Sequence, residues 1–340
     1  SGPNEFDQRL LSYFTRVQYN YKERYLLSAV VRRDGSSNFG PENKFGYFPS
    51  ASIGWVVSDE PFYGSNDILN FLKMRASYGI LGNDRIGAFG YISTLNAEGT
   101  YVFDNELVNG VAAGQLSNPE IKWERQKTFD VGFDSRLFNN KIDLTVDYFK
   151  RRTDDLLLVP QVSGILGVYA PGAGAPIVNA GSVENSGFEF SISYDEYISD
   201  DASFNLSYNF TTLKNEVLAV GNESGFIPGG GFGFGQEPPA RMEAGFPIGY
   251  FYGLQTNGIF QSQAEVDAHA TQADATLGDL RYVDQNNDGL IDGDDRINIG
   301  DPIPDVTMGL NLGFNYKNFD FTAYAFASIG NDIVRSYDRN

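Results

Sequence analysis

The chain has 340 residues, a net charge of −19, no cysteine and a single histidine, His269. The negative charge excludes a nucleic-acid-binding protein, because the chain cannot neutralise a row of phosphates. The missing cysteines exclude a disulfide framework, and the single histidine argues against a Ser/His/Asp triad. A glycosidase with paired carboxylates is the enzymatic alternative, but no pair stands out among the many Asp and Glu residues. We predict no enzyme and no organic cofactor.

Apolar and polar residues alternate with a period of two in ten segments, which predicts ten β-strands. In chain order these segments are 11–21, 25–33, 47–58, 71–82, 129–134, 142–148, 188–195, 204–211, 310–316 and 319–325. No run of eighteen apolar residues exists, so no transmembrane helix is expected.

The connections between these strands differ at the two ends of the expected sheet. At one end they are short turns, at 22–24, 139–141, 199–202 and 317–318, with a longer one at 59–70 that is expected to hold a short helical turn. At the other end they are long loops, which include 83–124 and 213–304. Short turns at one end and long loops at the other are typical of a transmembrane β-barrel.

An antiparallel sheet that covers a soluble core shows the same alternation, so a soluble sandwich is the alternative. The polar faces of the strands carry carboxylates that are too hydrophilic for a sandwich interior: Asp130, Asp134, Asp143, Asp147, Glu189 and Asp195. We therefore predict an all-β fold, a transmembrane antiparallel β-barrel of about ten strands with long extracellular loops. Residues 1–340 form a partial barrel domain, and 214–304 form its longest extracellular excursion.

The stretch DQNNDGLIDGDD, residues 284–295, has the spacing of a twelve-residue calcium loop. The predicted ligands are side-chain oxygens and one backbone carbonyl, from Asp284, Asn286, Asp288, Leu290 (carbonyl), Asp292 and Asp295. Asp295 stands where an EF-hand has glutamate, which is one methylene longer. The alternative is an acidic surface turn without an ion. We expect a structural Ca²⁺ rather than a catalytic metal.

Two further features lie in the loops. Ser262-Gln263-Ala264-Glu265 is a capping box, so a short surface helix is expected to run to about His269. Aromatic side chains that are candidates for cargo contact are Trp123, Phe232, Phe234, Tyr250, Phe251 and Tyr252, with packing between loops as the alternative role.

Seven stretches, in order along the chain, together resemble the SusC/RagA-type TonB-dependent outer-membrane transporters. They are LLSYFTRVQYNYKERYLLSAVVRRDGSSNFG (10–40), FGYFPSASIGWVVSDEPF (45–62), LKMRASYGILGND (72–84), NPEIKWERQKTFDVGFDSRLFNNKIDLTVDYFKRRTDDLLL (118–158), NAGSVENSGFEFSISY (179–194), FPIGYFYGLQTNGIFQS (246–262) and GDLRYVDQNNDGLIDGDDRINIGDPIPDVTMGLNLGFNYKNFDF (278–321).

The resemblance implies a place in the Gram-negative outer membrane, in contact with lipid, as an internal fragment of a larger barrel. It implies a SusD-like lipoprotein that closes over the barrel as a lid. It also implies energy from a TonB–ExbB–ExbD complex, delivered through an N-terminal part that this fragment lacks. The expected function is active import of a bulky nutrient, an oligosaccharide or a peptide. The alternative from the residues alone is a calcium-stabilised all-β surface binding or adhesion module.

Overall fold

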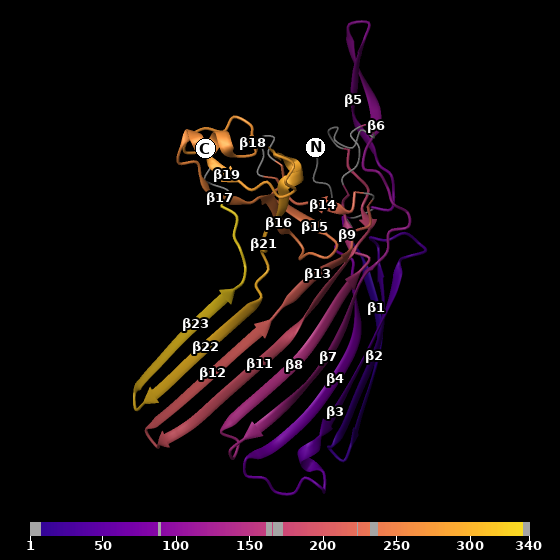
Figure 1. The fold of residues 1–340 in the computed structure, drawn as a ribbon. Helices are drawn as coiled ribbons and strands as arrows, with labels where there is room; N and C mark the ends of the chain where they lie inside the picture. Colours follow the sequence, from indigo (N-terminus) through magenta and orange to yellow (C-terminus); the bar gives the residue numbers. More distant parts are fainter. Residues whose placement is uncertain are drawn as a thin grey trace.

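The computed structural model describes residues 8–87, 90–160, 165, 173–222, 224–231 and 237–335. Its main feature is a curved antiparallel sheet in which ten strands lie side by side in the same order as in the sequence (Figure 1). These strands are β1 (Leu10–Tyr21), β2 (Tyr25–Ser36), β3 (Phe45–Val56), β4 (Leu69–Asn83), β7 (Glu124–Leu137), β8 (Ile142–Asp154), β11 (Ser182–Ser199), β12 (Ala202–Thr212), β22 (Val306–Tyr316) and β23 (Phe319–Ile329). The prediction of an antiparallel barrel wall is confirmed, and the described strands form an open portion of it.

One further strand of the sheet, β13 (Lys214–Ala219), lies outside this series of ten. It pairs with the first residues of β11, from Ser182 to Ser186, after β12 has ended. β11 is 18 residues long and has two partners along the same edge. Its first residues pair with β13, and its later residues pair with β12. The long excursion that follows β12 is thereby joined to the sheet where it begins.

The predicted asymmetry of the two ends is present. Short turns link β1 to β2, β7 to β8, β11 to β12 and β22 to β23 at the lower end of Figure 1, and the long loops gather at the upper end. Several turn residues have positive φ, including Lys22 (53°), Asn140 (62°) and Lys317 (52°), as tight hairpin turns require. The helical turn expected within 59–70 lies slightly earlier, as the 3₁₀ turn η1 (Val57–Asp59).

Strand register assigns alternate residues to two faces. Directly opposed residues share a face, so the polar face carries the row Arg75, Gly132, Asp147, Glu189 and Thr211. The apolar face carries the row Met74, Phe133, Val146, Phe190 and Phe210. The six carboxylates predicted to share one side of the sheet all lie on the polar face.

No second layer covers the apolar face within the described part of the chain. Ile53 is 59% exposed and Phe188 is 53% exposed, although both are large apolar residues in the middle of the sheet. The buried apolar clusters lie instead near the loop end, and they contain Phe39, Phe48, Ile121, Trp123 and Ile177 in one and Val183, Val217 and Met242 in the other. This arrangement contradicts the soluble sandwich and agrees with a face that meets lipid.

The loop end contains structure that the sequence patterns did not predict. A hairpin of β5 (Leu95–Phe103) and β6 (Glu106–Ala113) projects from the segment expected to be a loop (Figure 1). The excursion after β12 holds a four-stranded sheet of β14 (Phe226–Pro228), β15 (Ala240–Glu243), β16 (Tyr250–Leu254) and β21 (Arg296–Gly300). Shorter pairs are β9 (Leu157–Leu158) with β10 (Val178–Asn179), β17 (Thr256–Ile259) with β19 (Leu280–Tyr282), and β18 (Thr271–Gln272) with β20 (Leu290–Ile291).

The predicted surface helix is present as α1 (Gln263–Ala268). Ser262 is its N-cap, with the hydroxyl accepting a hydrogen bond from the Glu265 N–H, and His269 is its C-cap. No helix in the described ranges is long and apolar enough to cross a membrane.

Candidate functional site

The polar face of the sheet carries one arginine among three carboxylates. Arg75 on β4 lies with its Nη2 atom 2.6 Å from Asp147 Oδ2 and 3.3 Å from Asp134 Oδ1, and its Nη1 atom is 3.7 Å from Asp130 Oδ1. The three acidic residues come from β7 and β8, so the guanidinium joins three neighbouring strands. A charged group on the barrel wall is therefore held in place by ion pairs from two other strands.

Gly132 makes this arrangement possible. It is opposed to Arg75 on one side and to Asp147 on the other, and a Cβ atom at position 132 would overlap Asp147 Oδ1. The Asp147 side chain is 9% exposed, and its Oδ1 atom is buried with no hydrogen-bond partner in the described ranges. Because Gly132 has no side chain, the Asp147 carboxylate packs directly against the sheet and contacts the Arg75 guanidinium.

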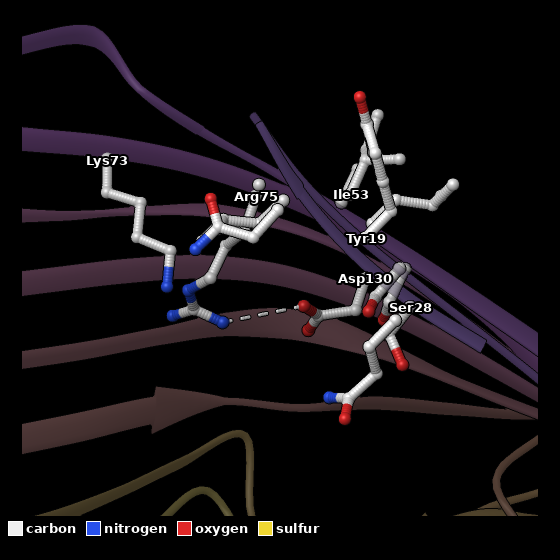
Figure 2. Close-up of a pocket in the computed structure, with 14 residues that line it drawn as sticks. Tyr19, Ser28, Ile53, Lys73, Arg75 and Asp130 are labelled. Carbon is white, nitrogen blue, oxygen red and sulfur yellow. Dashed lines mark ion pairs between the residues drawn. The ribbon is translucent and has the colours of Figure 1, made fainter. Parts of the chain in front are cut away.

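A hollow of about 600 Å³ lies beside this cluster on β1 to β4 and β7. Figure 2 shows Arg75 and Asp130 joined by their ion pair, with Lys73 next to them. The other polar residues that line the hollow are Gln18, Asn20, Ser28, Ser52 and Ser77. Such a wall offers both donors and acceptors, which suit the hydroxyls of a sugar or the amides of a peptide.

Trp123 has a packing role in this structure. It is 5% exposed and lies against Phe39 and Phe48, with ring centroids 5.0 and 5.3 Å away. Its indole Nε1–H donates a hydrogen bond of 3.3 Å to the Lys44 carbonyl. These contacts join the loop between β2 and β3 to the segment before β7, and packing between loops was the alternative role considered for the aromatic residues.

The other described aromatic candidates lie in the four-stranded sheet of the excursion. Tyr250 is 1% exposed, stacks on Phe246 at 4.5 Å and donates its hydroxyl to the Glu243 carboxylate. Burial, together with this carboxylate, raises the pKa of Tyr250 well above its usual range. The Tyr252 ring lies 3.4 Å from the Arg241 Cζ atom.

Three aromatic candidates remain. Phe251 is half-buried between β15 and β21. Phe232 and Phe234 lie outside the described residues. A cargo-contact role for the six aromatic residues therefore stays a prediction.

The acidic loop 284–295 folds on itself through side-chain oxygens. Asp284 Oδ2 accepts the Gly289 N–H at 3.0 Å, Asn286 Oδ1 accepts the Asp288 N–H at 2.9 Å, and Asp288 Oδ1 accepts the Leu290 N–H at 2.8 Å. The Asp284 Oδ1 atom is buried with no hydrogen-bond partner in the described part of the chain. Gly289 has φ +86°, which the sharp turn at position six of such a loop requires.

Asp295 closes the loop from within. The residue is fully buried, with Oδ1 accepting the Gln285 N–H at 2.7 Å and Oδ2 accepting the Asp292 N–H at 3.0 Å. These backbone hydrogen bonds, that of Asp292 first, lower the pKa of Asp295. Within the described residues, no three His, Cys, Asp or Glu side chains converge as a group that could hold a metal ion. Ca²⁺ binding by this loop therefore stays a prediction.

The sequence analysis did not identify Arg75 as the centre of an ion-pair cluster. The segment LKMRASYG places Lys73 and Arg75 on the polar face by period two, which was readable from the sequence. Their carboxylate partners depend on strand register across β4, β7 and β8, which period alone does not give.

Comparison with known proteins places the chain in a family. The profile described as "TonB dependent receptor-like, beta-barrel" matches residues 2–330. TonB-dependent receptor P3 of Formosa agariphila is 35% identical over 333 residues, which are 96% of this chain and 32% of that receptor. TonB-dependent receptor SusC of Bacteroides thetaiotaomicron is 31% identical over 97% of this chain and 32% of its own length. The chain thus spans about a third of the length of these relatives.

The fold has a solved counterpart. A structure described as the RagAB peptide transporter superposes with a TM-score of 0.77 at 24% identity, covering 95% of this chain and 34% of that one. This likeness shows the fold. The matched family and relatives are receptors rather than enzymes.

Proposed function

Because the chain belongs to the TonB-dependent receptor-like β-barrel family, whose members lie in the outer membrane, we propose that it forms part of the wall of an energised importer. The observation that supports this most directly is the sheet itself. Its apolar face is exposed along several strands, whereas its polar face carries a charged cluster beside a hollow that polar residues line in part. Lipid on one side and an aqueous passage on the other would suit the two faces.

The orientation of the wall follows from its connections. In outer-membrane barrels the short turns face the periplasm and the long loops face outward. The hairpin β5–β6, the four-stranded sheet and the acidic loop would then lie outside the cell, around the entrance. The Arg75 cluster would lie along the passage between the two ends.

The imported solute would be bulky and polar, an oligosaccharide or a peptide. Two comparisons support this choice: one relative is SusC, and the similar fold is described as a peptide transporter. By the same similarity, a SusD-like lipoprotein would cover the outer mouth, and a TonB–ExbB–ExbD complex would supply energy from the inner membrane.

We also propose that the acidic loop holds a structural Ca²⁺. Five carboxylates within twelve residues repel one another unless a cation balances them. The buried Asp284 Oδ1, which lacks a partner among the described atoms, is the oxygen best suited to a metal. The other ligands would come from Asn286, Asp288, the Leu290 carbonyl, Asp292 and Asp295. The ion would supply no chemistry, only rigidity to the excursion.

Uptake by cells tests the proposed function. Deletion of the gene for the full-length receptor should abolish uptake of either labelled oligosaccharides or labelled peptides, and the wild-type gene should restore it. A receptor that lacks its N-terminal TonB-binding segment should restore binding at the surface but not uptake. Unchanged uptake of both classes in the deletion strain, or recovery of the protein as a folded monomer in plain buffer, would contradict import.

A further inference from the structure

The four-stranded sheet of the excursion packs against the barrel wall with one of its two faces. Ile227 on β14 and Met242 on β15 are opposed, so their side chains share that face. Met242 is buried in one cluster with Val183 on β11 and Val217 on β13, and Ile227 packs against the same cluster. The second face of the four-stranded sheet is therefore turned away from the two valines.

The two valines lie on the polar side of the wall. Val183 and Glu189 belong to one unbroken register of β11 with β8, and their positions differ by an even number, so their side chains share a face. Val217 is opposed to Val183 and shares this face too. The four-stranded sheet thus covers the polar side of the wall at the loop end (Figure 1). Its second face is turned toward the entrance that the proposed function places there.

The second face carries an arginine that contacts two aromatic rings. The Cζ atom of Arg241 on β15 lies 3.4 Å from the centre of the Tyr252 ring on β16 and 4.1 Å from the centre of the Phe226 ring on β14. The register agrees with a common face, since Arg241 is opposed to Tyr250 and Phe226 is opposed to Glu243. Rings from both neighbouring strands therefore fix the position of the guanidinium.

The carboxylates on this sheet are engaged with other donors. Within the described residues, the Arg241 guanidinium forms no ion pair and donates no hydrogen bond. Glu243 accepts the Tyr250 hydroxyl, and Glu237 pairs with Arg296. Burial and Glu243 raise the pKa of Tyr250, and the charge of Arg241 acts on it in the opposite direction. The N–H groups of Arg241 are thus open to an acceptor that arrives from the entrance.

We propose that Arg241 binds a carboxylate of the imported solute at the entrance. A planar guanidinium presents pairs of N–H donors that match the two oxygens of a carboxylate. The rings of Phe226 and Tyr252 give this bond an apolar surrounding, which strengthens it. A peptide brings such a group at its C-terminus, and an acidic oligosaccharide brings it as a uronate. The inference rests on the proposed function for the statement that the polar side of the wall is the passage.

Native mass spectrometry of the full-length receptor in detergent tests the site with two pairs of probes. One pair is a pool of tetrapeptides with uncharged side chains and free C-terminal carboxylates, and the same pool as C-terminal amides. The other pair is a pool of uronate tetrasaccharides, and the same pool with the carboxylates reduced to alcohols. In one of these pairs the wild-type receptor should bind the acid form about tenfold more tightly than its neutral counterpart, the effect of one charge-assisted hydrogen bond.

Two substitutions of the arginine separate its charge from its geometry. Arg241→Gln should abolish the preference for the acid form, because it removes the charge. Arg241→Lys should keep part of the preference, since lysine retains the charge without the paired donors. Arg281→Gln is the matched control and should keep all of it. Arg281 lies in the same excursion, donates to Asn257 and is 3.6 Å from Glu265, so its charge is already paired.

Heat-modifiable migration on gels and protease resistance of the excursion show that each variant is folded. An Arg241→Gln receptor that prefers the acid form as strongly as the wild type overturns the proposal. So does a wild-type receptor that binds both forms of each pool equally or binds neither. Loss of the lipoprotein lid in Arg241→Gln, without a change in solute preference, also overturns it.

Uptake by cells is measured in parallel, so that failure of the site and failure of the proposed function are distinguishable. Equal import of the neutral pools and the acid pools, by wild type and by Arg241→Gln, overturns the carboxylate site alone. Absence of import of every pool by the wild type overturns the proposed function as well.

Discussion

The Asp147 carboxylate lies over Gly132, in the space that a side chain at that position would fill. The contact crosses from β8 to β7 and places Asp147 Oδ2 2.6 Å from the Arg75 guanidinium on β4. A glycine in a strand is usually a weak point. Here it is the reason why a charged cluster can form across three strands.

Gly132→Ala should destabilise the barrel wall. The added methyl group would overlap both the Asp147 carboxylate and the Val146 carbonyl oxygen, so the Asp147 side chain and the β8 backbone must move. Overpacking of this kind costs about 1–3 kcal/mol. Thermal unfolding of the full-length protein in detergent, followed by heat-modifiable gel migration, measures the loss. Gly87→Ala is the control, since no atom in the described ranges lies within 4 Å of a Cβ there. Equal stability of the two variants would contradict the close packing of β7 and β8 around Gly132.

Arg75 and Asp147 should be energetically coupled. Arg75→Gln leaves Asp147 nearly buried without its cation, whereas Asp147→Asn in the same protein removes the charge that needs it. Because the arginine side chain is 31% exposed, solvent weakens the effect, and we expect a coupling of about 1–2 kcal/mol. A double-mutant cycle on unfolding free energies gives the value. Additive effects of the two substitutions would mean that the ion pair contributes nothing.

Acid should loosen the loop that Asp295 closes. Its pKa is lowered in the folded protein by the backbone N–H groups of Asp292 and Gln285, so its stabilising effect is complete above the unfolded value of about 3.9. The effect is lost as the pH falls below that value through the folded pKa. Hydrogen exchange of residues 284–295, corrected for intrinsic rates, should therefore rise below about pH 4. Asp295→Asn should show fast exchange at every pH; protection that does not depend on pH in wild type would contradict the assignment.

Binding of Ca²⁺ should protect the excursion. If Asp284 Oδ1 is a ligand, chelation should speed proteolysis of residues 255–296 in the full-length receptor, and Ca²⁺ should reverse it. Asp284→Asn should abolish the protection, whereas Asp294→Asn, which lies outside the predicted ligand set, should retain it. Terbium luminescence gives a second measurement. Loss of terbium luminescence in Asp294→Asn but not in Asp284→Asn would show that the ion binds elsewhere.

Period-two patterns predicted all ten strands that run in chain order through the large sheet, because each strand has one apolar and one polar face. Strands of three to five residues, such as β14 and β15, are too short to show a period. The hairpin β5–β6 had a signal in the sequence that was missed, the pair Asp104-Asn105. Asp and Asn tolerate the positive φ that a two-residue hairpin turn requires, and both residues have it in the structure. The contacts of Arg75 were beyond prediction since they depend on the register of three strands.

The central claim is that the apolar face meets lipid and the polar face meets an aqueous passage. Spin labels on the full-length receptor in lipid vesicles test this claim. They are placed at two pairs of adjacent residues that lie on opposite faces, Ile53 with Ser52 and Ile192 with Ser191. Labels at Ile53 and Ile192 should collide more with oxygen, which concentrates in the bilayer, and labels at Ser52 and Ser191 more with a water-soluble nickel chelate. Labels at Ile53 and Ile192 that are shielded from both reagents would contradict the claim, because those side chains would then be buried against another layer of protein.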